Sequence, residues 1–214
     1  MIVYVSAIFI AFLSSLNSFR LDFPFHFKVF SILLGLTFLV ELTASLGIMV
    51  MHASKNHWLY NSFMLLEFPV YAFFYSRVVT KPEFRKVMFF FIVAFPIYWL
   101  VTVLFVFGIN TWNSYVILGG SFFTVLWVLM YYYELVMVRE VQSLRNQPEF
   151  WIATGMLIYY LGILPFYGML NFLVKYNIKI ANAIWQATVV MDTIMYLLFS
   201  YAYICRSQIA RKSL

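Results

Sequence analysis

Long apolar stretches alternate with short polar linkers along the whole chain. The stretches are about 20 residues long, the length that a helix needs to cross the hydrocarbon core of a bilayer. Pro24, Pro82 and Pro148 each lie just before a new stretch, where a proline can start a helix. The pattern predicts an all-α, polytopic membrane bundle that forms one domain over residues 1–214. Its seven spans are predicted at about residues 2–19, 28–51, 58–79, 86–107, 112–138, 150–174 and 180–205.

Composition strengthens this interpretation. Hydrophobic residues make up 64% of the chain, charged residues make up 10%, and the mean hydropathy is +0.90. A soluble domain carries about a quarter charged residues, so this chain lacks the polar side chains that would cover a soluble fold. Seven spans and short linkers also use its whole length. We therefore expect no extramembrane domain, no nucleic-acid binding and no soluble catalysis, and the lipid bilayer is the first predicted partner.

The basic residues predict the orientation of the bundle. The net charge is +6, and cytoplasmic loops carry an excess of Lys and Arg. We therefore expect a bacterial inner-membrane protein with its N-terminus outside and its C-terminus in the cytoplasm. The first stretch has no basic residue before Arg20, unlike a signal peptide, and is predicted to be a retained span. The predicted cytoplasmic side holds Arg20, Lys28, Arg77, Lys81, Arg85, Lys86, Arg139, Arg145, Arg206, Arg211 and Lys212, and the other side holds only Lys55, Lys175 and Lys179.

Three carboxylates, those of Glu41, Glu67 and Asp192, fall near the middle of predicted spans. Each lies roughly 15–20 Å from the basic residue at its cytoplasmic end, at a rise of 1.5 Å per residue, so we expect similar depths. Acids at such a depth are costly and usually face the bundle interior. No Lys or Arg lies in the middle of a span, so an internal salt bridge is not expected. The acids are either neutral groups that hydrogen-bond between helices, or a site for a proton, a metal cation or a cationic ligand.

Tyrosines and amides at helical spacing extend this candidate site. Tyr71 and Tyr196 each follow an acid by four residues, which places them on the same helix face. The second, third, sixth and seventh spans are predicted to build a ligand- or ion-binding site from Glu67, Asp192, Glu41, Tyr71, Tyr196, Asn61 and Gln186. A fourth acid, Glu134, follows three tyrosines near the cytoplasmic interface and is predicted to be a solvated helix-end acid beside an aromatic belt.

An internal similarity relates the third and seventh spans. At an offset of 125 residues, Tyr60 matches Trp185, Asn61 matches Gln186, Glu67 matches Asp192, Tyr71 matches Tyr196, and Phe74 matches Phe199. Gly35 and Gly155 match at an offset of 120. A duplication would give three helices, a linker helix and three more helices in a parallel repeat, as in some transporters. The other interpretation is coincidence in a chain that is 22% aromatic.

Mid-span prolines and glycines predict irregular or closely packed helices. Pro69, Pro96 and Pro165 each lie near the middle of a span, where a proline frees a carbonyl group and kinks the helix. Kinks at the depth of the acids would favour a central cavity. Gly155, Gly162 and Gly168 in the sixth span are predicted to allow close helix packing or motion.

The chain lacks the residues that several membrane chemistries require. The last span has no lysine for a retinal Schiff base. His26, His52 and His57 all lie at span ends, so no deep histidine is present for an intramembrane zinc hydrolase or for the Ser–His pair of a serine protease. The single cysteine, Cys205, excludes an internal disulfide and a cysteine-rich metal site, and is predicted to be apolar packing. We expect no enzyme activity, no cofactor and no metal centre.

Three segments resemble those of small uncharacterised seven-span membrane proteins of the Bacteroidota. They are Tyr60-Asn61 with Glu67-Phe68 and Tyr71, then Phe150-Trp151-Ile152, and then Trp185 with Tyr196-Leu197-Leu198-Phe199-Ser200-Tyr201. The resemblance implies seven spans and carries over no catalytic residue. Three functions stay open: a translocator of a small solute or cation, a ligand-sensing module that signals to a partner such as a kinase through its basic cytoplasmic face, and a structural subunit of a membrane complex.

Overall fold

The structure is a computed structural model that describes residues 2–51, 56–137, 144–176 and 178–212. Two of the basic linker residues counted above, Lys55 and Arg139, lie outside the described residues. The helices begin and end within a few residues of the predicted stretches, except that the last one continues well beyond residue 205. The elements are α1 (Ile2–Ser15), α2 (Asn17–Arg20), α3 (Phe25–Met51), α4 (His57–Val78), α5 (Pro82–Thr102), the π-helical turn η1 (Val103–Phe107), α6 (Ser114–Met137), the 3-10 turn η2 (Leu144–Asn146), α7 (Pro148–Tyr176) and α8 (Ile178–Lys212).

Prolines start two of the long helices, as predicted. Pro82 is the first residue of α5 and Pro148 is the first residue of α7. The missing N–H group of a proline costs nothing at this position, because the first N–H groups of a helix have no partner within it. The π-helical turn that extends α5 ends at Gly108, whose φ of 73° lies in the left-handed region that favours glycine.

Among the described residues, six helical segments are long and apolar enough to cross a membrane, and they indicate a multi-pass membrane protein. They are Val3–Arg20, Phe25–Gly47, Pro82–Phe107, Ser114–Met137, Pro148–Met169 and Asn182–Ile209. The remaining long helix, α4, carries Asn61, Glu67 and Arg77 among its 22 residues, and these lower its hydropathy. Its neighbours are largely protein, since it packs against α3, α5 and α6. A helix that contacts other helices can hold polar groups that lipid would not accept.

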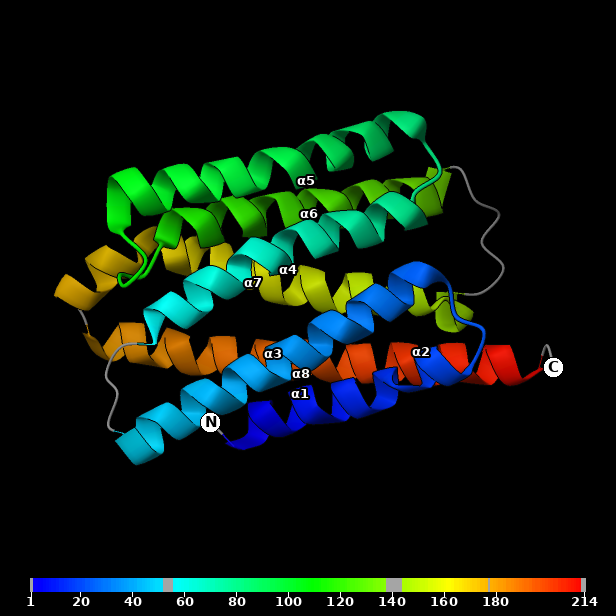
Figure 1. Cartoon of the computed structure of the whole chain (residues 1–214), viewed down its shortest axis with the longest axis horizontal. Coiled ribbons are helices and arrows are strands. Elements are labelled where there is room, and N and C mark those ends of the chain that lie inside the picture. The colour runs from blue at the N-terminus through cyan, green and yellow to red at the C-terminus, as the bar shows by residue number, and fades with distance from the viewer. Residues whose placement is uncertain (1, 52–55, 138–143, 177, 213–214) are drawn as a thin grey trace.

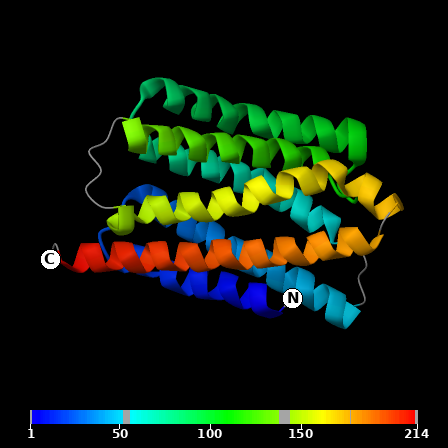
Figure 2. The same cartoon turned by 180° about the vertical axis from the view of Figure 1, so that it is seen from behind.

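The long helices form two layers that close into a ring. Figure 1 shows α1, α3 and α4 in the nearer layer, and Figure 2 shows α6, α7 and α8 in front when the molecule is turned. Within the layers, α1 packs on α3 and α3 on α4, while α6 packs on α7 and α7 on α8. Contacts of α1 with α8 and of α4 with α6 join the layers. The fifth helix lies outside this ring, against α4 and α6.

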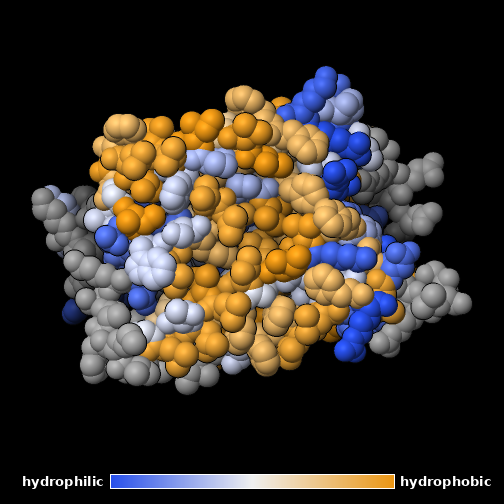
Figure 3. All heavy atoms as spheres, viewed as in Figure 1, coloured by the Kyte–Doolittle hydropathy of each residue, from blue (hydrophilic) through white to orange (hydrophobic). Residues whose placement is uncertain are grey.

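Aromatic side chains fill the centre of the ring. The ring of Phe30 lies 5.1 Å from that of Phe74 on α4 and 5.2 Å from that of Phe199 on α8, and all three residues are fully buried. Glycine allows the close contact of α7 with α8, as predicted, because a Cβ atom at Gly155 would lie 3.2 Å from the carbonyl oxygen of Met195. The prediction of close packing was wrong for Gly168, where a Cβ atom would meet nothing within 4 Å. The side of the bundle seen in Figure 3 is largely apolar, and its most hydrophilic side chains gather towards the ends.

Candidate functional site

Glu67 on α4 accepts hydrogen bonds from two buried tyrosines. The Tyr71 hydroxyl, one turn along the same helix, lies 2.9 Å from Oε1 of Glu67, and the Tyr160 hydroxyl from α7 lies 3.0 Å from the same oxygen. The Tyr160 hydroxyl also lies 3.2 Å from the Tyr71 hydroxyl. A phenol has one proton to donate, so Tyr160 can serve either Glu67 or Tyr71 at one time. This arrangement offers a proton two alternative positions.

Glu41 on α3 has a second pair of tyrosine donors. The Tyr4 hydroxyl from α1 lies 2.6 Å from Oε2 of Glu41, and the Tyr60 hydroxyl from α4 lies 3.1 Å from the same oxygen. Tyr60 precedes Glu67 by two turns of α4. The Glu41 carboxylate therefore contacts α4 about 10 Å nearer the start of that helix than Glu67 lies, at a rise of 1.5 Å per residue. The predicted similar depth of the acids therefore needs correction for Glu41. Sequence spacing did not reveal Tyr4 or Tyr160, because each comes from another helix.

Asp192 on α8 completes a cluster of three acids. It interacts electrostatically with Glu41 and Glu67, and Glu67 interacts with Glu41. Tyr196, which is 5% exposed, lies one turn further along α8 and interacts with Asp192. In the described part of the chain, no Lys or Arg contributes to the electrostatic environment of these acids. We call Glu41, Glu67, Asp192, Tyr4, Tyr60, Tyr71, Tyr160 and Tyr196 the acid–tyrosine cluster.

The cluster joins helices that sequence spacing placed together, namely α3, α4, α7 and α8, and adds α1. Each glutamate uses one oxygen for both of its tyrosines, and among the described residues the other oxygen accepts no hydrogen bond. Among the described residues, no group of three or more His, Cys, Asp and Glu side chains could hold a metal ion. Among the described residues the three acids therefore do not form one chelating site, and Glu41 and Glu67 each have their own pair of tyrosine donors.

Two predicted site residues lie apart from the acids. The Asn61 amide nitrogen donates to the carbonyl oxygens of Ile109 and Thr111, at 2.8 and 2.7 Å, and its Oδ1 accepts from the backbone of Asn113 at 3.3 Å. Asn61 therefore holds the loop between η1 and α6 onto α4. Its counterpart at the offset of 125, Gln186, is exposed on α8.

The matched positions of the two halves differ in their surroundings towards the ends of the spans. Tyr71, Tyr196, Phe74 and Phe199 are all buried, whereas Trp185 is 53% exposed and its match Tyr60 is half-buried. A Cβ atom at Gly35 would meet Phe12 of α1, while one at Gly155 would meet Met195 of α8. The similarity is therefore closest in the core of the bundle, around the acids.

The three mid-span prolines lie inside α4, α5 and α7, as the spans predicted. Pro69 and Pro96 line a groove on the outer face of the bundle whose other lining residues are also apolar. Pro165 is exposed on α7. The groove that the prolines share is thus separate from the acid–tyrosine cluster.

Glu134 is not the solvated acid that its position near the interface predicted. It is 0% exposed. Its Oε2 accepts from the backbone N–H and the hydroxyl of Thr80, at 2.6 and 2.9 Å, and its Oε1 accepts from the N–H of Lys81 at 2.8 Å. These donors belong to the residues just before α5, so the carboxylate lies at the positive end of the helix dipole. The prediction was wrong because the loop covers this acid from another part of the chain.

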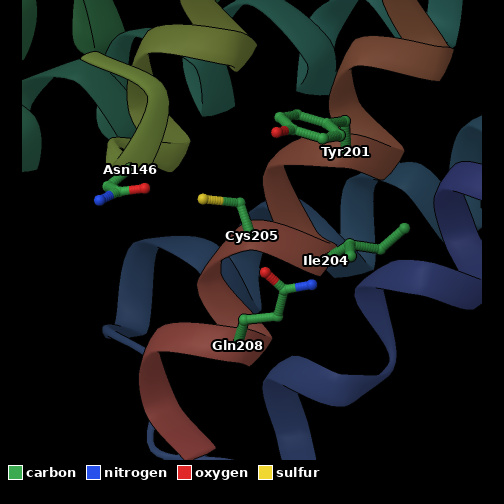
Figure 4. Close-up of a pocket in the computed structure, with 5 residues that line it drawn as sticks. All are labelled: Asn146, Tyr201, Ile204, Cys205 and Gln208. Carbon is green, nitrogen blue, oxygen red and sulfur yellow. The ribbon is translucent and has the colours of Figure 1, made fainter. Parts of the chain in front are cut away.

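A second pocket lies at the end of the bundle that carries most of the basic residues. It has a volume of about 280 Å³ and lies between η2 and α8, where it is lined by Asn146, Tyr201, Ile204, Cys205 and Gln208 (Figure 4). The thiol of Cys205 points towards Asn146 in Figure 4, and Cys205 is buried, in accord with its predicted packing role.

Comparisons with known proteins give no relative for this chain. No protein-family model matches it, and neither a curated protein nor a solved structure matches it. The resemblance to seven-span proteins of the Bacteroidota therefore stays a prediction, and the function has to be argued from the site.

Proposed function

We propose that this is a bacterial inner-membrane protein of seven transmembrane helices that translocates or binds a small solute or cation at the acid–tyrosine cluster. The observation that carries the proposal is the geometry of two glutamates on neighbouring helices, each of which accepts hydrogen bonds from two tyrosines and from no Lys or Arg among the described residues. Ionisable residues within membrane helices mark ion and proton pathways when they face one another across a bundle. Acids that served only to hold helices together by hydrogen bonds would not need to lie within electrostatic reach of each other.

The tyrosines supply a path for the proton or cation. Glu41 binds near the start of α1 and of α4, and Glu67 lies deeper, with Asp192 coupled to both. Tyr160 can pass its hydrogen bond between Glu67 and Tyr71, which changes how strongly the Glu67 carboxylate is stabilised without moving a helix. We infer that the substrate or coupling ion enters at Glu41 and is bound by Glu67 and Asp192.

The helix contacts support a parallel 3+1+3 repeat as the basis of the movement. A two-fold relation that exchanges α1 with α6, α3 with α7 and α4 with α8 also exchanges the contacts of the ring in pairs. The α1–α3 contact becomes the α6–α7 contact, α3–α4 becomes α7–α8, and α1–α8 becomes α4–α6. Such an axis runs along the membrane normal, as in parallel-repeat transporters. The outlying α5 then takes the place of the linker helix, and Glu67 and Asp192 are equivalent.

The first experiment reconstitutes the purified protein in liposomes and measures flux of protons and of small cations. We expect flux in the wild type and its loss in Glu67→Gln and in Asp192→Asn, because each change removes one charge and keeps nearly the same shape. Glu83→Gln is the matched control, since Glu83 is an exposed acid in the first turn of α5. Flux that both cluster variants retain would remove these acids from the mechanism.

A ligand sensor is the second candidate, and the pocket between η2 and α8 favours it. That pocket lies on the helix that carries Asp192, so a ligand-driven shift of α8 would reach it. A sensor would show no flux in liposomes and would co-purify with a partner such as a kinase. Loss of the co-purifying partner in the Gln208→Ala variant would assign this role, provided that the Asp192→Asn variant still folds.

A further inference from the structure

A groove of about 480 Å³ lies on the outer face of the bundle, where α3, α4 and α5 meet. Its volume falls within the range of sites for small ligands. Neither Glu67 nor another member of the acid–tyrosine cluster lines it. The lining residues are Val29, Leu65, Leu66, Pro69, Val70, Phe73, Ile92 and Pro96.

The side of α4 that faces the groove runs from apolar residues to a basic one. Pro69, Phe73 and Arg77 follow each other at four-residue spacing, so they share one face of the helix. The Arg77 guanidinium lies 5.3 Å from the centre of the Phe73 ring. The apolar lining thus ends at an exposed, permanently charged side chain.

Two further basic residues lie at the same end. The Nε of Arg85 on α5 donates to the carbonyl oxygen of Val79 at 2.8 Å, which places Arg85 beside the end of α4. A guanidinium has five N–H donors, so others stay available to an anion. Lys28 directly precedes the lining residue Val29 on α3. The charge at this end of the groove therefore comes from each of the three helices that form it.

The stretch of α4 from the groove to Arg77, which lies beyond the lining residues, matches the depth of one leaflet of a bilayer. From Leu66 to Arg77 the rise of α4 is about 16 Å, at 1.5 Å per residue. The hydrocarbon core of a bilayer is about 30 Å thick, so one leaflet contributes about 15 Å. A chain that enters at Arg77 from the headgroup region would end near Leu66. The neighbouring surface of α5 is apolar and open, with Val93 at 68% and Ile97 at 61% exposed.

We propose that the groove is a binding site for an anionic phospholipid of the leaflet at the basic end of the bundle. One acyl chain lies along Phe73, Pro69 and Leu66, and the phosphate is bound by Arg77, Arg85 and Lys28. The prolines contribute compact side chains where larger residues would fill the space. A zwitterionic lipid would fit the same groove, but it would bring no net charge to the basic residues and would exchange more readily.

The test uses the full-length protein in bilayer nanodiscs of equal phosphatidylglycerol and phosphatidylcholine. Native mass spectrometry then measures which lipids stay bound on gentle release. We expect the wild type to retain phosphatidylglycerol in preference to phosphatidylcholine. Arg77→Gln and Lys28→Gln should each lower that preference about fivefold, because a basic residue near a membrane surface contributes about that factor. Lys81→Gln is the matched control, since its ammonium lies 4.5 Å from the Tyr133 ring, towards α6.

A steric pair of variants tests the acyl chain separately. Leu66→Trp should occupy the groove and lower retention of both lipids, whereas Val93→Trp, on the open surface of α5, should leave retention unchanged. Leu66 is 50% exposed, so a larger side chain there need not disturb the core. Equal retention of the two lipids by the wild type would overturn the proposal. Equal effects of Arg77→Gln and Lys81→Gln, or of Leu66→Trp and Val93→Trp, would also overturn it.

Discussion

Glu134 shows how much one buried carboxylate can hold in place. Its two oxygens take three hydrogen bonds from Thr80 and Lys81, and these fix the turn that separates α4 from α5. Arg77, in the last turn of α4, and Arg85, near the start of α5, lie on either side of this turn. A carboxylate that accepts backbone N–H groups at a helix start gains both from the hydrogen bonds and from the helix dipole.

We therefore expect Glu134→Gln to destabilise the protein. An amide keeps one acceptor but turns the other into a donor that faces N–H groups, which leaves buried donors unsatisfied. The expected loss is about 1–3 kcal/mol of unfolding free energy, measured by thermal or denaturant unfolding in detergent. Glu83→Gln should change the stability little, because that side chain is exposed. Equal stability of Glu134→Gln and the wild type would contradict the capping role.

At the scale of the elements, α4 is the helix on which the other parts depend. It donates Glu67 and Tyr71 to the cluster, holds a loop through Asn61, and forms one wall of the groove. Its position among α3, α5 and α6 explains why it can carry so many polar side chains. Its contact with α6 depends on Gly120, because the ring of Phe68 occupies the place where a Cβ atom would stand.

Gly120→Ala should separate α4 from α6. Phe68 is 1% exposed and packs against the rings of Phe95 and Tyr160, so it cannot move aside. Overpacking of this kind costs about 1–3 kcal/mol, and unfolding in detergent would measure it. Gly168→Ala is the control, since a Cβ atom there meets nothing within 4 Å, and alanine favours a helix more than glycine does. We expect opposite signs for the two variants, and the same sign would contradict the close contact.

At the scale of the whole molecule, the two layers create an interior that combines aromatic packing with a few acids. The ring closes because α1 returns to pack on α8, which brings Tyr4 to Glu41. This closure places the partly buried acids of the cluster between the layers and leaves α5 on the outside, where much of its apolar surface is exposed. The basic residues collect at the end where α3 and α5 begin and α4 ends.

The charge bias predicts that this basic end lies in the cytoplasm. A fluorescent protein fused to the C-terminus should then fluoresce in bacterial cells, and alkaline phosphatase at the same position should stay inactive. At the N-terminus, with the first span intact, alkaline phosphatase should be active. Active phosphatase at the C-terminus would reverse the orientation and would place the lipid site in the outer leaflet.

Local pattern was enough for much of this picture. The helices, their proline starts and the membrane character follow from the lengths of apolar stretches, because each helix forms its own backbone hydrogen bonds within the bilayer. The same reasoning placed Glu67 with Tyr71, and Asp192 with Tyr196, on one face of their respective helices, because residues four apart share a side of a helix. Three of the helices that build the site, α3, α4 and α8, were predictable from the acids that occur on them.

Tertiary structure alone decided which partners these residues meet. Tyr4 and Tyr160 reach the glutamates from helices that are 37 and 93 residues away in the chain, and no local spacing encodes that approach. The Asn61 amide donates to a carbonyl group of a loop, and the Glu134 carboxylate caps the start of α5, which is a different helix. The groove beside Pro69 and Pro96 likewise exists only where three helices meet. The hydrophobic pattern sets which residues are buried, whereas the neighbours of a buried polar group depend on how the helices pack. The packing therefore decides whether that polar group holds helices together, caps a helix or forms part of a functional site.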